Sequence, residues 1–199
     1  MSKLIPAILL CATAVGTASA QQPATGYGRN LLTVSPVQVS EMTLTGVGIQ
    51  YEHFIGSSNK FSLYLPLAYS FGKSDPCNDL VRTHMLYAYP GFKFYPAGSQ
   101  HKVTYAVGPS IAVGKGNTNC ACVNGGEEVG LEIVTAKEYK PITEIGMLIN
   151  NSINIQASQH IYLGGEVGVG SSFVNIENGK DFGRDLMLQM NVKVGYRFK

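Results

Sequence analysis

Apolar and polar residues alternate along most of the chain, most regularly in its last segment, Leu186–Phe198. Successive side chains of a β-strand point to opposite sides of the sheet, so a period of two predicts a strand with two unlike faces. One face of this segment carries large apolar side chains, and the other carries mostly polar or small ones. The apolar face comprises Leu186, Leu188, Met190, Val192, Val194, Tyr196 and Phe198.

Six earlier segments repeat this alternation and a less regular one precedes them, which makes eight predicted strands. Pro36 lacks the N–H that a sheet ladder needs, so it predicts an irregular or bulged first strand. Asn151 interrupts an apolar row and predicts a bulge in the sixth strand. The predicted strands are Asn30–Ser40, Thr43–Ile55, Phe61–Phe71, Met85–Pro96, Val103–Gly114, Ile142–Gln156, Ile161–Phe173 and Leu186–Phe198.

Short and long connections alternate between these strands. Bacterial membrane barrels have short turns on the periplasmic side and longer loops outside, with aromatic residues at both strand ends. The rhythm and the even strand number therefore predict an all-β fold, an eight-stranded antiparallel up-and-down transmembrane β-barrel. The short connections are Gly56–Lys60, Ala97–Lys102 and Ala157–His160, and the longer ones are Lys73–His84, Lys115–Pro141 and Asn175–Asp185.

The two faces of the strands also predict which side of the barrel is inside. A soluble lipid-binding barrel would instead turn its bulky apolar residues inward and cover its exterior with charges. Here the second face is small and carries few charges, which suits a narrow lumen. Three acids and three bases are predicted to point inward and to form ion pairs there. They are Glu52, Lys93, Glu144, Glu166, Lys193 and Arg197.

Composition and the start of the chain agree with a membrane barrel. Charged residues make up 14% of the sequence and glycine accounts for 23 residues, with a formal net charge of +2 and no basic block that indicates nucleic acid as a partner. Lys3, the apolar stretch Leu4–Val15 and the small residues Ala18-Ser19-Ala20 predict a cleaved secretory signal peptide over residues 1–20. Residues 21–29 are then a flexible lead-in, and residues 30–199 are the barrel domain.

With these features, residues 30–199 resemble the small eight-stranded outer-membrane proteins of Gram-negative bacteria. The ending Val194-Gly195-Tyr196-Arg197-Phe198 is similar to the aromatic end that the barrel-assembly machinery recognises in such proteins, although Lys199 follows it here. The segments Asn30–Pro36 and Gly48–Glu52 also look like those of uncharacterised barrel proteins of Bacteroidetes-type bacteria. The resemblance implies an outer-membrane location, with outer-membrane lipids and the assembly machinery as partners, and it brings no known activity.

Cysteine and histidine residues in the longer loops are the candidates for chemistry. A secreted protein favours a disulfide between Cys77 and either Cys120 or Cys122. A second possibility is a metal site that these three cysteines form with His84. We expect the disulfide, and we expect neither a metal nor a cofactor.

His84 also shares a predicted loop with Asp75 and Asp79, an acid–base combination that a rim enzyme could use. No motif of known catalytic context accompanies them, so we expect no enzyme activity. The run Gly164–Gly170 lacks the Gly-Lys-Ser/Thr ending of a phosphate loop, and its period of two indicates a strand with small lumen-facing residues.

These observations predict a monomeric outer-membrane barrel with a structural or surface-interaction role and exposed outer loops. A narrow porin for small solutes is the main competing hypothesis, although eight strands leave an interior mostly filled by side chains. A soluble lipid-binding barrel and a rim enzyme are the two remaining hypotheses. The sequence identifies no external ligand.

Overall fold

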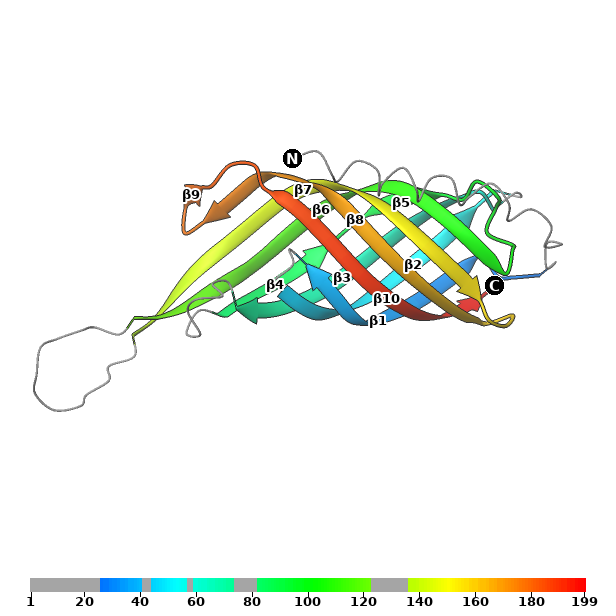
Figure 1. Ribbon diagram of the computed structural model, residues 1–199, viewed down its shortest axis with the longest axis horizontal. Coiled ribbons are helices and arrows are strands. Elements are labelled where there is room, and N and C mark those ends of the chain that lie inside the picture. The colour runs from blue at the N-terminus through cyan, green and yellow to red at the C-terminus, as the bar shows by residue number, and fades with distance from the viewer. Residues whose placement is uncertain (1–25, 41–43, 57–58, 74–81, 123–135) are drawn as a thin grey trace, which may run out of the picture.

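The protein folds as a closed antiparallel β-barrel with eight strand positions, as the sequence predicts (Figure 1). We call each position a stave, because one of them is formed by two short strands in line. The computed structural model describes residues 26–40, 44–56, 59–73, 82–122 and 136–199. Within these ranges, no helix has the length and apolar character needed to cross a bilayer. The strands are β1 (Asn30–Ser40), β2 (Leu44–Ile55), β3 (Phe61–Lys73), β4 (Arg82–Ala88), β5 (Gly91–Phe94), β6 (Val103–Cys122), β7 (Ala136–Gln156), β8 (Ile161–Glu177), β9 (Lys180–Asp181) and β10 (Leu186–Phe198).

The last strand closes the barrel, because β10 pairs with β1 on one side and with β8 on the other. Each of the other staves pairs with its neighbours in the sequence. We call the end with the connections after β2, β5 and β7 the turn end and the opposite one the loop end. Residues 1–20 and the start of the lead-in lie outside the described residues, so the signal peptide stays a prediction.

One predicted strand, Met85–Pro96, is divided in two. β4 and β5 form a single stave between β3 and β6, with a break at Tyr89 and Pro90. Pro90 has no N–H to give to the ladder, which explains the break. The stave stays in line because Tyr89 N–H donates to Pro66 O at 2.9 Å and Ile111 N–H donates to Pro90 O at 2.9 Å.

The two predicted bulges have different outcomes. The pairing of β1 shifts register around Pro36 against both β2 and β10, which confirms the first. The bulge predicted at Asn151 is wrong, because Asn151 pairs in unbroken register with Val107 and Val167. β7 instead shifts register against β8 between Ile145 and Gly146.

Strands β6, β7 and β8 extend furthest beyond their predicted ends toward the loop end. β6 and β7 pair as far as Cys122 opposite Ala136, so much of the predicted loop Lys115–Pro141 is strand, and this hairpin extends past the other staves (Figure 1). β8 continues to Glu177 and turns back into β9 over Asn178 and Gly179, whose φ angles are 50° and 77°. Positive φ at both central residues is the type I′ turn that an Asn-Gly pair favours.

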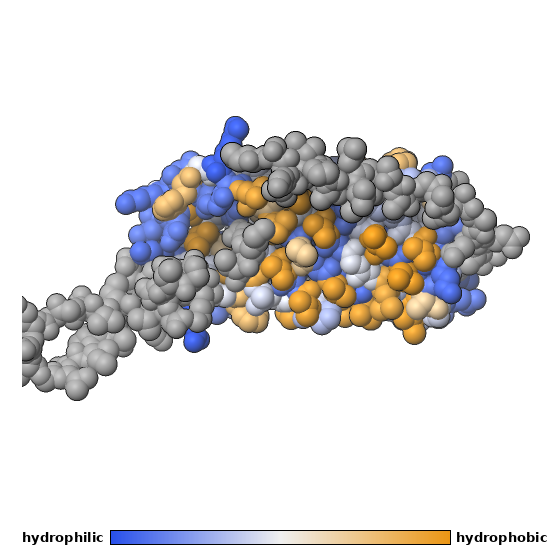
Figure 2. Space-filling view, viewed as in Figure 1, coloured by the Kyte–Doolittle hydropathy of each residue, from blue (hydrophilic) through white to orange (hydrophobic). Residues whose placement is uncertain are grey.

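The wall and the lumen carry the predicted faces. Leu63, Leu65 and Val194 are exposed on the outside, while Glu52 and Lys193 are buried inside. A face of the barrel is therefore largely apolar between two polar ends (Figure 2). Such a wall is what hydrocarbon solvates and water does not.

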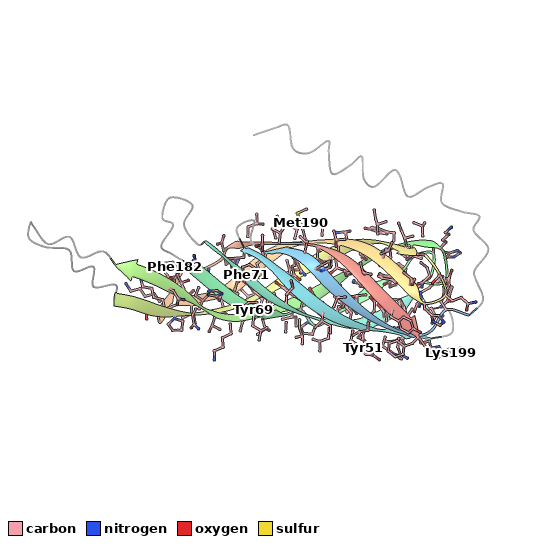
Figure 3. All side chains as sticks on the ribbon, turned by 90° about the horizontal axis from the view of Figure 1, so that it is seen from below. Tyr51, Tyr69, Phe71, Phe182, Met190 and Lys199 are labelled. Carbon is pink, nitrogen blue, oxygen red and sulfur yellow. The ribbon has the colours of Figure 1, made fainter. Side chains whose placement is uncertain are left out.

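Aromatic side chains mark both ends of this apolar wall. Tyr51 points outward near the turn end, whereas Tyr69, Phe71 and Phe182 point outward toward the loop end (Figure 3). Phe61 and Phe94 add a pair at the turn end, with ring centroids 5.2 Å apart. Two aromatic belts that flank an apolar band are typical of membrane barrels.

Two glycines of β8 provide a test of how closely the staves approach one another. A Cβ atom at Gly170 would lie 1.8 Å from the backbone oxygen of Met147, whereas one at Gly165 would meet its nearest atom at 4.0 Å. Gly170→Ala should lower the free energy of unfolding by about 1–3 kcal/mol because the neighbouring backbone must move. Gly165→Ala should change it by less than about 0.5 kcal/mol. Urea titration in detergent micelles, followed by circular dichroism, measures both, and equal losses would contradict this packing.

Candidate functional site

Four of the six predicted inward charges meet in the lumen, each supplied by a different strand. Glu52 of β2, Lys93 of β5, Glu166 of β8 and Lys193 of β10 are all buried, with exposed fractions of 3% or less. Lys193 Nζ donates to Glu166 Oε2 at 2.6 Å, and Lys93 Nζ donates to the same oxygen. Lys93 Nζ also lies 4.0 Å from Glu52 Oε2. We call these four residues the charge cluster; its two acids balance its two bases.

Polar neighbours satisfy the Glu52 end of the cluster. Glu52 Oε1 accepts hydrogen bonds from Ser62 Oγ and from the Tyr95 hydroxyl, both at 2.5 Å. Gln50 joins the two halves, since its Nε2 donates to Glu52 Oε2 at 3.0 Å and its Oε1 accepts from Lys193 Nζ at 3.4 Å. Buried charges persist only when they are paired and hydrogen-bonded in this way.

Lys93 also contacts an aromatic ring. Its Nζ lies 4.3 Å from the centroid of the Tyr64 ring, which is a cation–π geometry. The Tyr64 hydroxyl accepts a hydrogen bond from Asn150 Nδ2 at 2.7 Å, and Asn150 also donates to Ser110 Oγ at 2.7 Å. The polar contacts thereby continue from the cluster across the lumen to β6 and β7.

The other two predicted charges lie inside the barrel but apart from the cluster. Glu144 accepts a hydrogen bond from the Tyr87 hydroxyl at 2.8 Å nearer the loop end. Arg197 lies at the turn end, where it donates to Gly28 O at 2.7 Å and Ser99 O at 2.9 Å. Its guanidinium also stacks over the Phe54 ring at 4.2 Å. Among the described side chains no carboxylate forms an ion pair with Arg197, and the ion pairs of the charge cluster itself join two acids and two bases.

Two apolar layers that the sequence analysis did not identify flank the charge cluster. Along β2, Leu44 of one layer precedes Glu52, and Phe54 of the other follows it, so the cluster lies between them. Aromatic pairs tighten both layers: the Tyr87 and Tyr89 rings stack with centroids 5.4 Å apart, and the Phe54 and Tyr95 rings pack at a tilt with centroids 5.4 Å apart. The loop-side layer comprises Leu44, Ala68, Met85, Tyr87, Tyr89, Ala112, Leu148 and Met187, and the turn-side layer comprises Leu31, Phe54, Tyr95, Ala106 and Tyr162.

Glycines make room for the loop-side layer. A Cβ at Gly146 would lie 2.3 Å from Met187 Sδ, and one at Gly114 would lie 2.4 Å from the Tyr87 ring. The inward glycines of β6 and β7 are therefore the sequence signal for this layer, because small residues on one stave leave space for large ones on the next.

The cysteine predictions fall mostly outside the described structure. Cys77 lies outside the described residues, and only the backbone is described for Cys120 and Cys122, which belong to β6 and not to a loop. The disulfide stays a prediction. In the described part of the chain, no group of three His, Cys, Asp or Glu residues is placed to hold a metal ion.

His84 lies on the outer face of β4 and not in a loop. Its Nδ1 is 3.1 Å from the Tyr69 hydroxyl, and the two rings stack with centroids 6.2 Å apart. Its predicted acid–base partners, Asp75 and Asp79, lie outside the described residues. His84 therefore contacts Tyr69 in the aromatic belt at the loop end.

Comparison with known proteins shows the fold of an outer-membrane barrel. No protein-family model matches this chain, and no curated protein is detectably similar to it in sequence. A major outer membrane protein from Thermus thermophilus matches with a TM-score of 0.59 at 9% identity, covering 85% of this chain and 99% of that one. The outer membrane protein OprG from Pseudomonas aeruginosa matches with a TM-score of 0.54 at 12% identity, covering 87% of this chain and 98% of that one. Ail, the attachment invasion locus protein of Yersinia pestis, matches with a TM-score of 0.53 at 10% identity, covering 86% of this chain and 99% of that one.

The charge cluster predicts how the barrel responds to loss of one carboxylate. Glu166→Gln leaves two buried ammonium groups with only Glu52 to balance them, which should cost about 3–5 kcal/mol of unfolding free energy. Glu177→Gln, near the loop end of the same strand, serves as the matched control and should cost less than about 0.5 kcal/mol. Urea titration in micelles measures both.

A double variant separates charge balance from general damage. Adding Lys193→Met to Glu166→Gln restores one acid and one base, so it should recover most of the lost stability. A double variant that is as unstable as Glu166→Gln alone would show that the cluster is not held by its charge balance.

Proposed function

We propose that this protein resides in the outer membrane as a monomeric, non-conducting barrel with a structural or surface-interaction role. The apolar wall and its two aromatic belts support this location, because water would not solvate such a wall. The shared fold with outer-membrane proteins of three bacteria supports it too. The turn end then faces the periplasm and the loop end faces outward, with lipids and the barrel-assembly machinery as partners.

The filled lumen is the observation that carries the proposal. An apolar layer lies on each side of the charge cluster, and the largest inward side chains, including Arg197, Tyr87 and Lys93, are fully buried. A solute would have to displace packed aromatic rings and then separate paired charges. This favours a structural role over that of a narrow porin.

The projecting hairpin supports a role in surface interaction. Among the described residues, β6 beyond the Arg82–Asn119 pair and β7 outward of Pro141, whose oxygen accepts from the Asn178 N–H, pair only with each other. Both strands therefore present backbone N–H and C=O groups that no other described strand pairs with, and an extended segment of a partner can add there by β-pairing. The proposal includes no catalytic step.

Membrane location is tested by fractionation combined with gel mobility. The protein should co-sediment with outer membrane, need detergent for extraction, and migrate differently before and after boiling because a closed barrel resists dodecyl sulfate. The boiled sample is the internal control for the unfolded chain. Recovery of the folded protein in the soluble periplasmic fraction would favour the soluble lipid-binding barrel instead.

Conductance in planar bilayers tests whether the lumen is closed. Folded protein added to a bilayer should produce no steady current, because an ion would have to displace both packed layers to pass. A porin inserted in the same bilayers is the positive control for detection. A steady open-state current from the unmodified protein would support the porin hypothesis.

A further inference from the structure

An apolar groove crosses the outside of the barrel over β1 to β4. It has a volume of about 470 Å³, and its lining includes Val34, Pro36, Ile49, Leu67, Tyr69 and Leu86. One end lies at the Pro36 bulge, where the ladder between β1 and β2 shifts register.

The other end of the groove leads to a pair of exposed cations. Leu86, which lines the groove, is paired in register with Lys115 of β6, so their side chains lie beside each other on the outer wall. Arg82 follows on the same face of β4, four residues nearer the loop end. Lys115 and Arg82 are both exposed, and neither forms an ion pair with any described carboxylate.

The aromatic belt places these cations at the level of lipid headgroups. Tyr69 belongs both to the groove and to the belt at the loop end, and it lies in the same row of the sheet as Lys115, with Leu86 of β4 between them. A cation on the lipid-facing wall is unfavourable unless its flexible side chain reaches an anionic group at the interface. Beside Lys115, the groove provides an apolar surface that begins at Leu86.

From this juxtaposition we infer that the groove is a binding site for a phosphate-bearing lipid of the outer leaflet. One acyl chain lies along Leu67, Ile49 and Val34, and the phosphate contacts the Lys115 ammonium group and the Arg82 guanidinium. Arginine and lysine are the side chains that best recognise phosphate oxygens. This inference rests on the proposed location in the outer membrane.

The headgroup contact is tested with two lipids that share the same acyl chains. Native mass spectrometry of the folded protein in micelles should show tighter retention of phosphatidic acid than of phosphatidylcholine. The double variant Arg82→Gln/Lys115→Gln should weaken phosphatidic acid binding by about fivefold for each cation removed. Lys180→Gln, which removes an exposed cation from β9, is the matched control and should leave binding unchanged.

The groove itself is tested by filling it. Val34→Phe enlarges an exposed side chain that lines the groove, so binding of both lipids should be lost while the barrel keeps its heat-dependent gel mobility. Equal retention of the two lipids, or a double variant that binds phosphatidic acid as well as the unmodified protein does, would overturn the lipid site. Such a result would leave the membrane location intact, because fractionation and gel mobility measure that separately.

Discussion

Closure of the sheet is the constraint on which the rest of the structure depends. Because β10 pairs with both β8 and β1, the ring has no free edge along most of its length, and its backbone groups bond within it. Closure also divides every strand into residues that face a narrow lumen and residues that face the surroundings. The inward face therefore has to combine small residues, paired polar groups and packed apolar layers within a narrow space, and the other face is free to be apolar throughout.

The narrowness of the lumen explains why the charges of the cluster are paired with one another and hydrogen-bonded. Glu166 accepts from two ammonium groups, and Glu52 is held by two hydroxyls and an amide, because desolvated charges gain stability only through such partners. The apolar layers on both sides keep water from the cluster, and the exclusion of water strengthens each electrostatic contact. Packing and charge pairing thus act together to close the interior.

The sequence predicts the parts of this fold that follow from alternation and misses the parts that follow from distant contacts. Strand β10 is predicted from the sequence because its apolar row is unbroken. The outer half of β6 has no apolar row, and the sequence therefore predicts a loop there. Asn151 looks like an interruption because its partner, the Tyr105 hydroxyl at 2.5 Å, is 46 residues away. Arg197 suggests an ion pair by its type, but the fold brings it to the carbonyl groups of Gly28 and Ser99, a pairing that no local pattern encodes.

Departures from the regular ladder are where this barrel acquires features of its own. A uniform sheet would present an even apolar wall, and Pro36 disturbs it because its ring cannot donate to the ladder and displaces β1. The resulting groove ends beside Lys115, the first charge in an outward row that runs through Ile111 and Val113. A row that changes from apolar to cationic at the aromatic belt matches the change from hydrocarbon to headgroup in the surrounding lipid. The same alternation that defines the wall therefore also places this cationic step beside an apolar groove.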